Sequence, residues 1–158
     1  MKNSDIIFIN NNIKFNFRVG LIIQNKNRFL LQKSIKDDFF GLIGGRVQLG
    51  ENTKKTAIRE AKEELDIDIN EDNLKINFIS ENFFSYNTQK FHEILYIYKY
   101  RIDDFHELAK KDNFPCCDKI STTMQWFDIH DIKDLDLRPC FIKTNIEKNQ
   151  FKFVINAE

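Results

Sequence analysis

The 158-residue sequence lacks the features that mark several protein classes. Its three cysteines, Cys116, Cys117 and Cys140, include an adjacent pair and form no Cys-x-x-Cys motif, which argues against a disulfide framework and against a cysteine-based zinc site. The apolar runs are too short to cross a bilayer, and the N-terminus lacks the layout of a signal peptide. We therefore expect a cytoplasmic protein that has reduced thiols and no membrane contact.

An excess of charge of either sign is also missing. Lys and Arg together number 24, as do Asp and Glu, so the formal net charge is zero. Nucleic-acid affinity rests largely on contacts between cations and phosphates, so we expect no general nucleic-acid binding. With 42% hydrophobic and 30% charged residues, the chain can bury a core, and its length predicts a single domain over residues 1–158.

Glycine is scarce, but its distribution is informative. Four of the five glycines, at positions 41, 44, 45 and 50, fall within ten residues. Glycine allows backbone angles and close approaches that other residues do not. A cluster of glycines in a chain that otherwise has few is the first sign of a ligand-binding loop.

Hydrophobic patterning predicts many strands and few helices. Alternation from Ile13 predicts a strand that becomes fully buried towards Ile23, followed by a turn at 25–27 and a return strand. Further strands are expected at 39–43, 47–49, 75–79, 82–86, 91–102 and 126–129, and helices at 53–65, near 131–135 and from Pro139 to before Asn149. These elements predict an α+β fold, in which a mixed β-sheet is sandwiched between helices as an α/β/α sandwich.

The expected helix over residues 53–65 gathers carboxylates on one side. At 100° per residue, Glu63 and Glu64 each project within about 60° of Glu60, on an exposed face roughly opposite the apolar stripe. Like charges at this spacing repel, so the cluster makes chemical sense if a cation lies among them. Carboxylates are suitable ligands for Mg²⁺ or Mn²⁺. The alternative is a solvated acidic helix face that binds nothing.

The glycine loop can take part in the same site. Gly44 and Gly45 can turn tightly and bring a backbone carbonyl or N–H next to a metal or a phosphate. Arg59 lies beside the acidic face and can pair with Glu51, holding the loop on the helix through a bidentate link that lysine would not reproduce.

Together these residues resemble the Nudix box. The resemblance rests on seven residues at the spacing of that motif: Gly45, Glu51, Arg59, Glu60, Glu63, Glu64 and Ile67. Asp66 departs from the pattern, because the family usually has a glycine there to end the helix. The resemblance implies a Nudix-like fold and hydrolysis, with Mg²⁺ or Mn²⁺ as its substitute, of a nucleoside diphosphate linked to another group.

The resemblance also implies roles for single residues. Glu60, Glu63 and Glu64 would ligate the cations together with a backbone carbonyl in Gly44-Gly45, while Glu51 and Arg59 would brace the site. The partner would be a small-molecule nucleotide, and a homodimer is the oligomer that the family suggests. Nucleoside triphosphates or nucleotide sugars are favoured by elimination, because the proline signatures of the ADP-ribose and NADH subgroups are absent. A non-catalytic nucleotide sensor and an RNA 5′-end pyrophosphohydrolase are the alternatives.

Several residues outside the motif keep two interpretations. Arg18 can meet a substrate phosphate or form a surface salt bridge. Phe83, Phe84 and Tyr86, which follow the box where Nudix enzymes often contact substrate, can stack on a base or pack in the core. Glu93, and with weaker support Glu107, can be an extra metal ligand or base, or an ion-pair partner.

Overall fold

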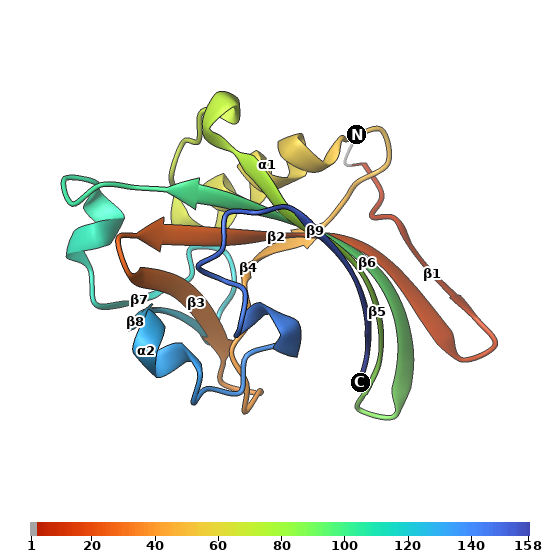
Figure 1. Ribbon diagram of the computed structural model, residues 1–158. Helices are drawn as coiled ribbons and strands as arrows, with labels where there is room; N and C mark the ends of the chain where they lie inside the picture. Colours follow the sequence, from red (N-terminus) through yellow and green to blue (C-terminus); the bar gives the residue numbers. More distant parts are fainter. Residues whose placement is uncertain (1–2) are drawn as a thin grey trace.

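In the computed structural model, which describes residues 3–158, a mixed nine-stranded β-sheet organises the described chain (Figure 1). The strand order is β7-β8-β3-β2-β6-β5-β9, and β1 and β4 both pair with β2. The strands are β1 (Ile7–Asn10), β2 (Ile13–Asn25), β3 (Arg28–Ser34), β4 (Ile43–Arg46), β5 (Lys75–Tyr86), β6 (Gln89–Arg101), β7 (Asn113–Pro115), β8 (Thr122–Asp128) and β9 (Lys152–Ala157). Two pairs, β2 with β6 and β5 with β9, are parallel, and the other pairs are antiparallel.

Strand β2 is the axis of the sheet, because it pairs with four other strands along its length. It is exposed at Ile13, partly buried over most of residues 14–18 and fully buried from Val19 to Ile23, so the predicted increase in burial along the strand is confirmed. Its middle pairs with β4, so that Gly44 lies opposite Gly20. At Gly44, where φ is 151°, an added Cβ would lie 2.0 Å from the carbonyl oxygen of Val19, so only glycine allows this approach. The strand pairing thus fixes the glycine loop.

One face of the sheet is covered by helix α1 (Thr53–Leu65), whose residues Ala57, Ala61 and Leu65 enter the core. Asn52 caps the helix, since its side chain accepts a 2.9 Å hydrogen bond from the backbone N–H of Lys55. The predicted helix is therefore confirmed at both ends. No helix within residues 3–158 is long and apolar enough to cross a membrane.

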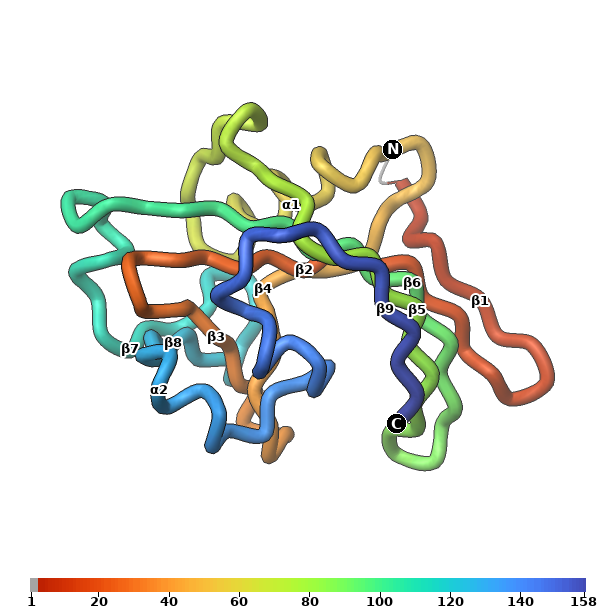
Figure 2. The backbone as a smooth tube through the Cα atoms, in the orientation of Figure 1, coloured from red at the N-terminus to blue at the C-terminus, as the bar shows by residue number. Residues whose placement is uncertain are grey.

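The other face is covered by the short helix α2 (Ile129–Ile132), a 3₁₀ turn at Cys140–Ile142 and irregular chain (Figure 2). This segment buries Ile132, Leu137, Ile142 and Ile146 against the sheet in a second core cluster. The α+β fold with a mixed sheet between helical layers is confirmed, although this second layer consists of much shorter elements than α1.

The structure corrects the sequence analysis near the C-terminus. The helix expected from Pro139 is wrong, because the chain forms only the 3₁₀ turn and then isolated turns up to Glu147. Its single apolar i, i+4 pair, Ile142 and Ile146, anchors one turn and offers no longer stripe for burial. Strand β9 was not predicted; it lies at the edge of the sheet, where it pairs with β5 and leaves Phe153 and Ile155 exposed.

Two strand predictions also change. The strands expected at 75–79 and 82–86 are one strand, β5, which has an irregularity between Ile76 and Phe78. The expected strand at 47–49 is reduced to a single bridge between Gln48 and Asp5, because the chain turns there towards α1. Both differences reflect pairing with distant strands, which local patterning does not reveal.

Candidate metal centre and active site

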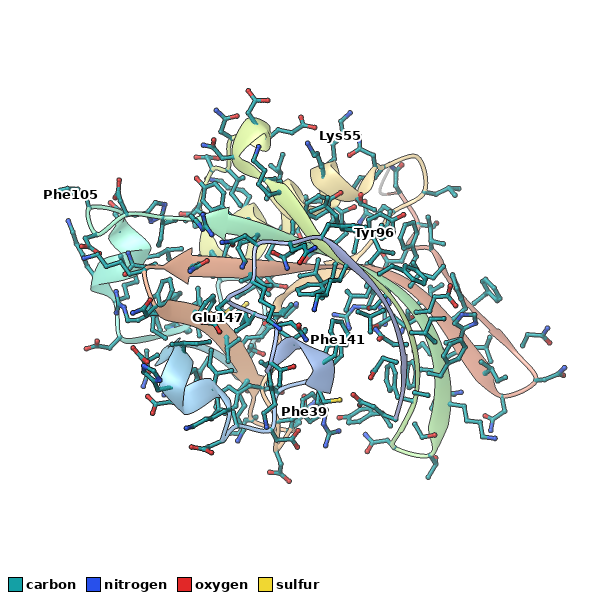
Figure 3. All side chains as sticks on the ribbon, viewed as in Figure 1. Phe39, Lys55, Tyr96, Phe105, Phe141 and Glu147 are labelled. Carbon is teal, nitrogen blue, oxygen red and sulfur yellow. The ribbon has the colours of Figure 1, made fainter. Side chains whose placement is uncertain are left out.

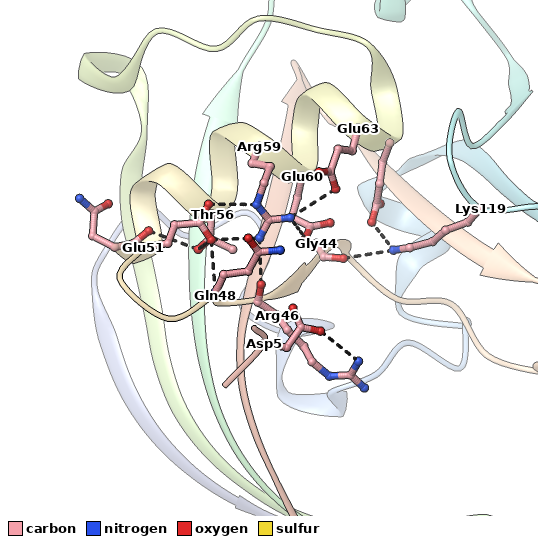
Figure 4. A network of polar contacts seen from close by, with 12 residues as sticks. Asp5, Gly44, Arg46, Gln48, Glu51, Thr56, Arg59, Glu60, Glu63 and Lys119 are labelled. Carbon is pink, nitrogen blue, oxygen red and sulfur yellow. Dashed lines mark hydrogen bonds and ion pairs between the residues drawn. The ribbon is translucent and has the colours of Figure 1, made fainter. Parts of the chain in front are cut away.

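The loop before α1 is fastened to the helix by Arg59. Its Nε donates to Glu51 Oε1 at 2.9 Å and its Nη2 to Glu51 Oε2 at 3.0 Å, and Nη2 also donates to the carbonyl of Arg46 at 3.0 Å (Figure 4). The hydrogen bond that Arg59 donates to Glu51 raises the pKa of Arg59. Burial acts to raise the pKa of Glu51, but hydrogen bonds from Arg59 and Thr56 lower it below its ordinary value. The expected bidentate brace is present, and both partners are charged.

Glu60 occupies the place where Gly45 would carry a side chain. An added Cβ at Gly45 would lie 2.1 Å from Glu60 Oε1, so the residue must be glycine for the carboxylate to lie there. Glu60 is only 6% exposed and accepts a 2.7 Å hydrogen bond from Arg59 Nη1. The carboxylate thus lies directly on the glycine loop.

Glu64 is the most deeply buried acid of the helix, with no exposed surface. One carboxylate oxygen pairs with the ammonium of Lys119, while the other, Oε2, has no hydrogen-bond partner among the described residues. Burial raises the pKa of Glu64 to about 7, although the Lys119 ammonium acts to lower it. A buried carboxylate oxygen without a partner is costly, so a cation placed beside it would be stabilised by it.

The expectation that all three carboxylates are exposed is therefore wrong. Only the side chain of Glu63, which is 46% exposed, faces solvent, and it accepts a 3.3 Å hydrogen bond from Arg59. Glu60 and Glu64 lie under the glycine loop and the chain that follows β7, because α1 packs against β4 along this side as well as along its apolar stripe.

Lys119 is the residue of this centre that sequence reasoning missed. It lies between β7 and β8, and its ammonium donates to Glu64 Oε1 and, at 3.3 Å, to the carbonyl of Gly44 (Figure 4). The backbone N–H of Cys117 donates to the carbonyl of Glu64 at 2.9 Å and docks this loop on the end of α1. A single lysine 55 residues from its partner carries no local sequence signal.

The donor set fits a hard divalent cation. The carboxylates of Glu60 and Glu64 and the carbonyl of Gly44 are oxygen ligands of the kind that Mg²⁺ and Mn²⁺ prefer. No group of three or more His, Cys, Asp or Glu side chains in residues 3–158 is already gathered around one point. Arg59 and Lys119 hold the carboxylates apart, so metal binding requires rearrangement of side chains.

A cleft of about 1020 Å³ opens beside this centre, and Lys119 lines both. Its floor carries Asn16 of β2, Glu93 of β6 and Asn82 of β5, which are neighbours in register across the sheet. Asn82 donates to Glu93 at 3.0 Å, and each of the three side chains is at least 95% buried. In the part of the chain that the structure describes, the Oδ1 atoms of Asn16 and Asn82 have no partner. The floor therefore presents hydrogen-bond acceptors.

Two residues proposed for substrate contact line this cleft. Arg18 lies 3.8 Å from Glu93 in an ion pair, so it takes part in a salt bridge and still faces the cleft. Tyr86 donates a 2.6 Å hydrogen bond to Asp37 across the cleft.

Phe83 lies elsewhere. It stacks on His92, with 4.5 Å between ring centroids, and is not part of the cleft lining. Side chains alternate between the faces of a strand, so Phe84, which was considered for the same role, does line the cleft. Glu107 begins a 3₁₀ turn, Glu107–Lys110, outside the cleft, whereas Glu93 lies on its floor.

Asp66 ends α1 in the manner of the glycine that it replaces. Its φ and ψ, 53° and 40°, lie in the left-handed region, and its N–H donates to the carbonyl of Lys62 at 3.1 Å. Its carboxylate also pairs with the Lys62 ammonium at 2.9 Å. The departure from the motif therefore leaves the helix terminus intact.

Comparison with known proteins identifies the family to which this fold belongs. The family model for the NUDIX domain matches residues 14–144. The structure resembles the MutT protein from Bacillus halodurans, with a TM-score of 0.70, 15% identity and coverage of 90% of this chain and 89% of that one. It also resembles the C. elegans Ap4A hydrolase, with a TM-score of 0.56, 19% identity and coverage of 85% and 95%. None of the curated proteins matches the sequence. The chain belongs to the Nudix family of hydrolases, enzymes that act on phosphoanhydride bonds and generally need a divalent metal.

Proposed function

We propose that this Nudix protein uses Mg²⁺, bound at Gly44, Glu60, Glu63 and Glu64, to hydrolyse a phosphoanhydride bond in a nucleoside diphosphate linked to another group. The observation that carries the proposal is the buried Glu64, which has one unpartnered oxygen in the described chain and lies beside the Gly44 carbonyl and near Glu60. When bound, the metal would neutralise the diphosphate and acidify a water for attack on phosphorus.

In this proposal some residues would ligate the metal, and others would position the glycine loop. Glu60 and Glu64, which are buried, and Glu63, which is half-exposed, would hold the cation. Glu51 and Arg59 keep the glycine loop against the helix, so that the Gly44 carbonyl stays in range. Because a ligand misplaced by an ångström costs much of the rate, this brace contributes to turnover without touching the substrate.

The cleft supports a nucleotide with a sizeable second moiety as the substrate. Its volume of about 1020 Å³ lies at the upper end of the range for small-molecule sites, roughly 300–1,000 Å³. Arg18, Arg46 and Lys119 line it and can bind phosphates. The acceptors on the floor suit the N–H or O–H groups of a base or sugar, and the rings of Phe84 and Tyr86 offer a surface for stacking.

These features favour a nucleoside triphosphate or a nucleotide sugar. A non-catalytic nucleotide sensor is less well supported, because the carboxylates of the motif are all retained. An RNA 5′-end pyrophosphohydrolase is less well supported because the formal net charge is zero. The homodimer and the cytoplasmic location stay predictions.

The test is a hydrolysis screen over nucleoside triphosphates, nucleotide sugars, dinucleoside polyphosphates and triphosphorylated RNA, with and without Mg²⁺ and with products identified by mass. We expect metal-dependent cleavage of a small nucleotide. Glu64→Gln should lower turnover by at least about 100-fold, because it removes a charged metal ligand. Glu107→Gln, an exposed change outside the cleft, is the control. Tight binding without cleavage would favour the sensor, and near wild-type turnover in Glu64→Gln would refute the ligand assignment.

A further inference from the structure

We propose that Lys119 is an internal counter-ion. Its ammonium neutralises the metal ligands when no metal is bound, and it moves to contact the substrate phosphates when the metal binds. This inference rests on the proposed function, because it assumes that Gly44 and Glu64 are metal ligands.

Lys119 contacts two of the residues proposed to ligate the metal. Its ammonium donates to the carbonyl of Gly44, a proposed ligand, and to Oε1 of the proposed ligand Glu64, whose other oxygen, Oε2, has no partner in the described chain. Glu64 has no exposed surface, so without a cation its charge would be buried and uncompensated. Lys119 supplies that compensation in the metal-free state.

The ammonium and the metal would compete for these two groups. Two cations in contact with the same carboxylate and carbonyl repel each other strongly in a buried setting. A metal ligated by the Gly44 carbonyl would therefore displace the ammonium from that oxygen, which belongs to the backbone of β4, and would weaken its contact with Glu64.

The side chain of Lys119 can move while the backbone of its loop stays in place. Its side chain is 40% exposed and sits on a flexible four-carbon stem. The loop backbone is held by hydrogen bonds of 2.9 Å from Cys117 N–H to the Glu64 carbonyl and from Cys116 N–H to the Thr122 carbonyl. Lys119 also lines the substrate cleft, so an ammonium that leaves Glu64 enters the space proposed for the diphosphate.

Arg59, the other cation of this centre, is held differently. It makes two hydrogen bonds to Glu51 and one to the carbonyl of Arg46, in addition to its bond to Glu60. Those contacts would keep its guanidinium in place if Glu60 gave up its hydrogen bond from Arg59 to ligate the metal. Within the described chain, the hydrogen bonds of the Lys119 ammonium go only to the proposed ligands Glu64 and Gly44. Lys119 is therefore the cation that exchanges with the metal.

The proposal makes two predictions of opposite sign for Lys119→Met. Removal of the competing cation should tighten Mn²⁺ binding to the nucleotide-free protein by at least about 10-fold. Removal of the phosphate contact should weaken binding of a non-hydrolysable triphosphate in the presence of metal by about 10-fold. A lysine that only stabilised the loop would lower both affinities together or change neither.

The experiment measures Mn²⁺ binding by calorimetry, with thermal unfolding as a check on folding. Lys119→Arg, which keeps the charge, should bind Mn²⁺ as the unchanged protein does. Lys55→Met is the matched control, because Lys55 lies on the same helix, α1, and its side chain is exposed (Figure 3). Should Lys119→Met fold poorly, the side-chain NMR signal of Lys119 in the unchanged protein provides the second readout, and it should shift when Mg²⁺ is added.

The outcomes separate this inference from the proposed function. Mn²⁺ binding that depends on Glu64 but is the same with and without Lys119, or a Lys119 signal that does not respond to Mg²⁺, would overturn only the exchange. Mn²⁺ binding that is unaffected by Glu64→Gln would contradict the metal site itself, and with it the proposed function.

Discussion

Arg59 and Glu51 are joined by two hydrogen bonds of 2.9 and 3.0 Å, one from Nε and one from Nη2 of the guanidinium. The same Nη2 reaches back to the carbonyl of Arg46, so one side chain fastens α1 to both sides of the loop that follows β4. The catalytic competence that we propose depends on this fastening, because it sets the distance between the glycine loop and the acidic helix.

Arg59→Lys should loosen that connection while keeping the charge. A lysine cannot form two parallel hydrogen bonds to Glu51 and also reach the Arg46 carbonyl, so we expect a loss of about 1–3 kcal/mol in the free energy of unfolding. We also expect weaker stabilisation by Mg²⁺. Urea unfolding with and without Mg²⁺ measures both, and Arg101→Lys at the exposed end of β6 is the control. Equal stability of Arg59→Lys and the unchanged protein would contradict the bracing role.

Gly45→Ala should disrupt the metal centre through steric contact alone. The new methyl would lie 2.1 Å from Glu60 Oε1, so Glu60 must leave its position. Gly41→Ala is the matched control, because a Cβ there meets no atom of the described chain within 4 Å and its φ is not in the left-handed region. We expect Gly45→Ala to lose most of the Mg²⁺-induced rise in melting temperature and Gly41→Ala to keep it. Equal responses of the two variants would show that the position of Glu60 is irrelevant to metal binding.

Lys99 should be important for stability and not for the metal. It is 4% exposed, and its ammonium donates to the carbonyls of Ile146 at 2.7 Å and Lys148 at 2.8 Å, which ties the segment before β9 to the sheet. Lys99→Met leaves both carbonyls without this donor and should cost about 2–4 kcal/mol in the free energy of unfolding. Lys90→Met, at an exposed position of the same strand, should cost little. Chemical denaturation compares the two, and similar losses would refute the anchoring role.

The pKa of Glu64 gives the metal-free protein a specific pH dependence. Burial raises that pKa from 4.5 to about 7. A raised folded-state pKa contributes stability below about pH 4.5, and this contribution is lost as the pH rises through about 7. The metal needs the ionised form, so stabilisation by Mg²⁺ should be larger at pH 8 than at about pH 5.5.

Thermal unfolding across this pH range checks that prediction. Glu64→Gln should remove the component of the pH dependence that falls between about 4.5 and 7, because glutamine does not titrate. Identical pH profiles for the variant and the unchanged protein would mean that another group titrates there.

The box and its helix could be predicted because their signals are local. The cap at Asn52, the apolar stripe and the spacing from Gly45 to Glu64 all lie within about one loop and one helix, and the structure places them as expected. The burial of Glu60 and Glu64 was not predicted, because a helical projection shows which side chains share a face and does not show what packs against that face.

The rest of the site depends on pairings that no local pattern reveals. Asn16, Glu93 and Asn82 meet on the cleft floor only because β2 and β6 run parallel and β5 pairs with β6. Lys119 reaches Glu64 only because the loop after β7 docks on the end of α1. Strand β9 could not be predicted for the same reason, because its position in the sheet depends on parallel pairing with the distant strand β5.

The most direct test of the account is the position of Mn²⁺ in crystals of the protein, located by its anomalous diffraction. We predict a peak in direct coordination with the Gly44 carbonyl and the carboxylates of Glu60, Glu63 and Glu64, with the Lys119 ammonium withdrawn into the cleft. A peak that lies away from these oxygens, or no peak at Mn²⁺ concentrations that support hydrolysis, would contradict the account.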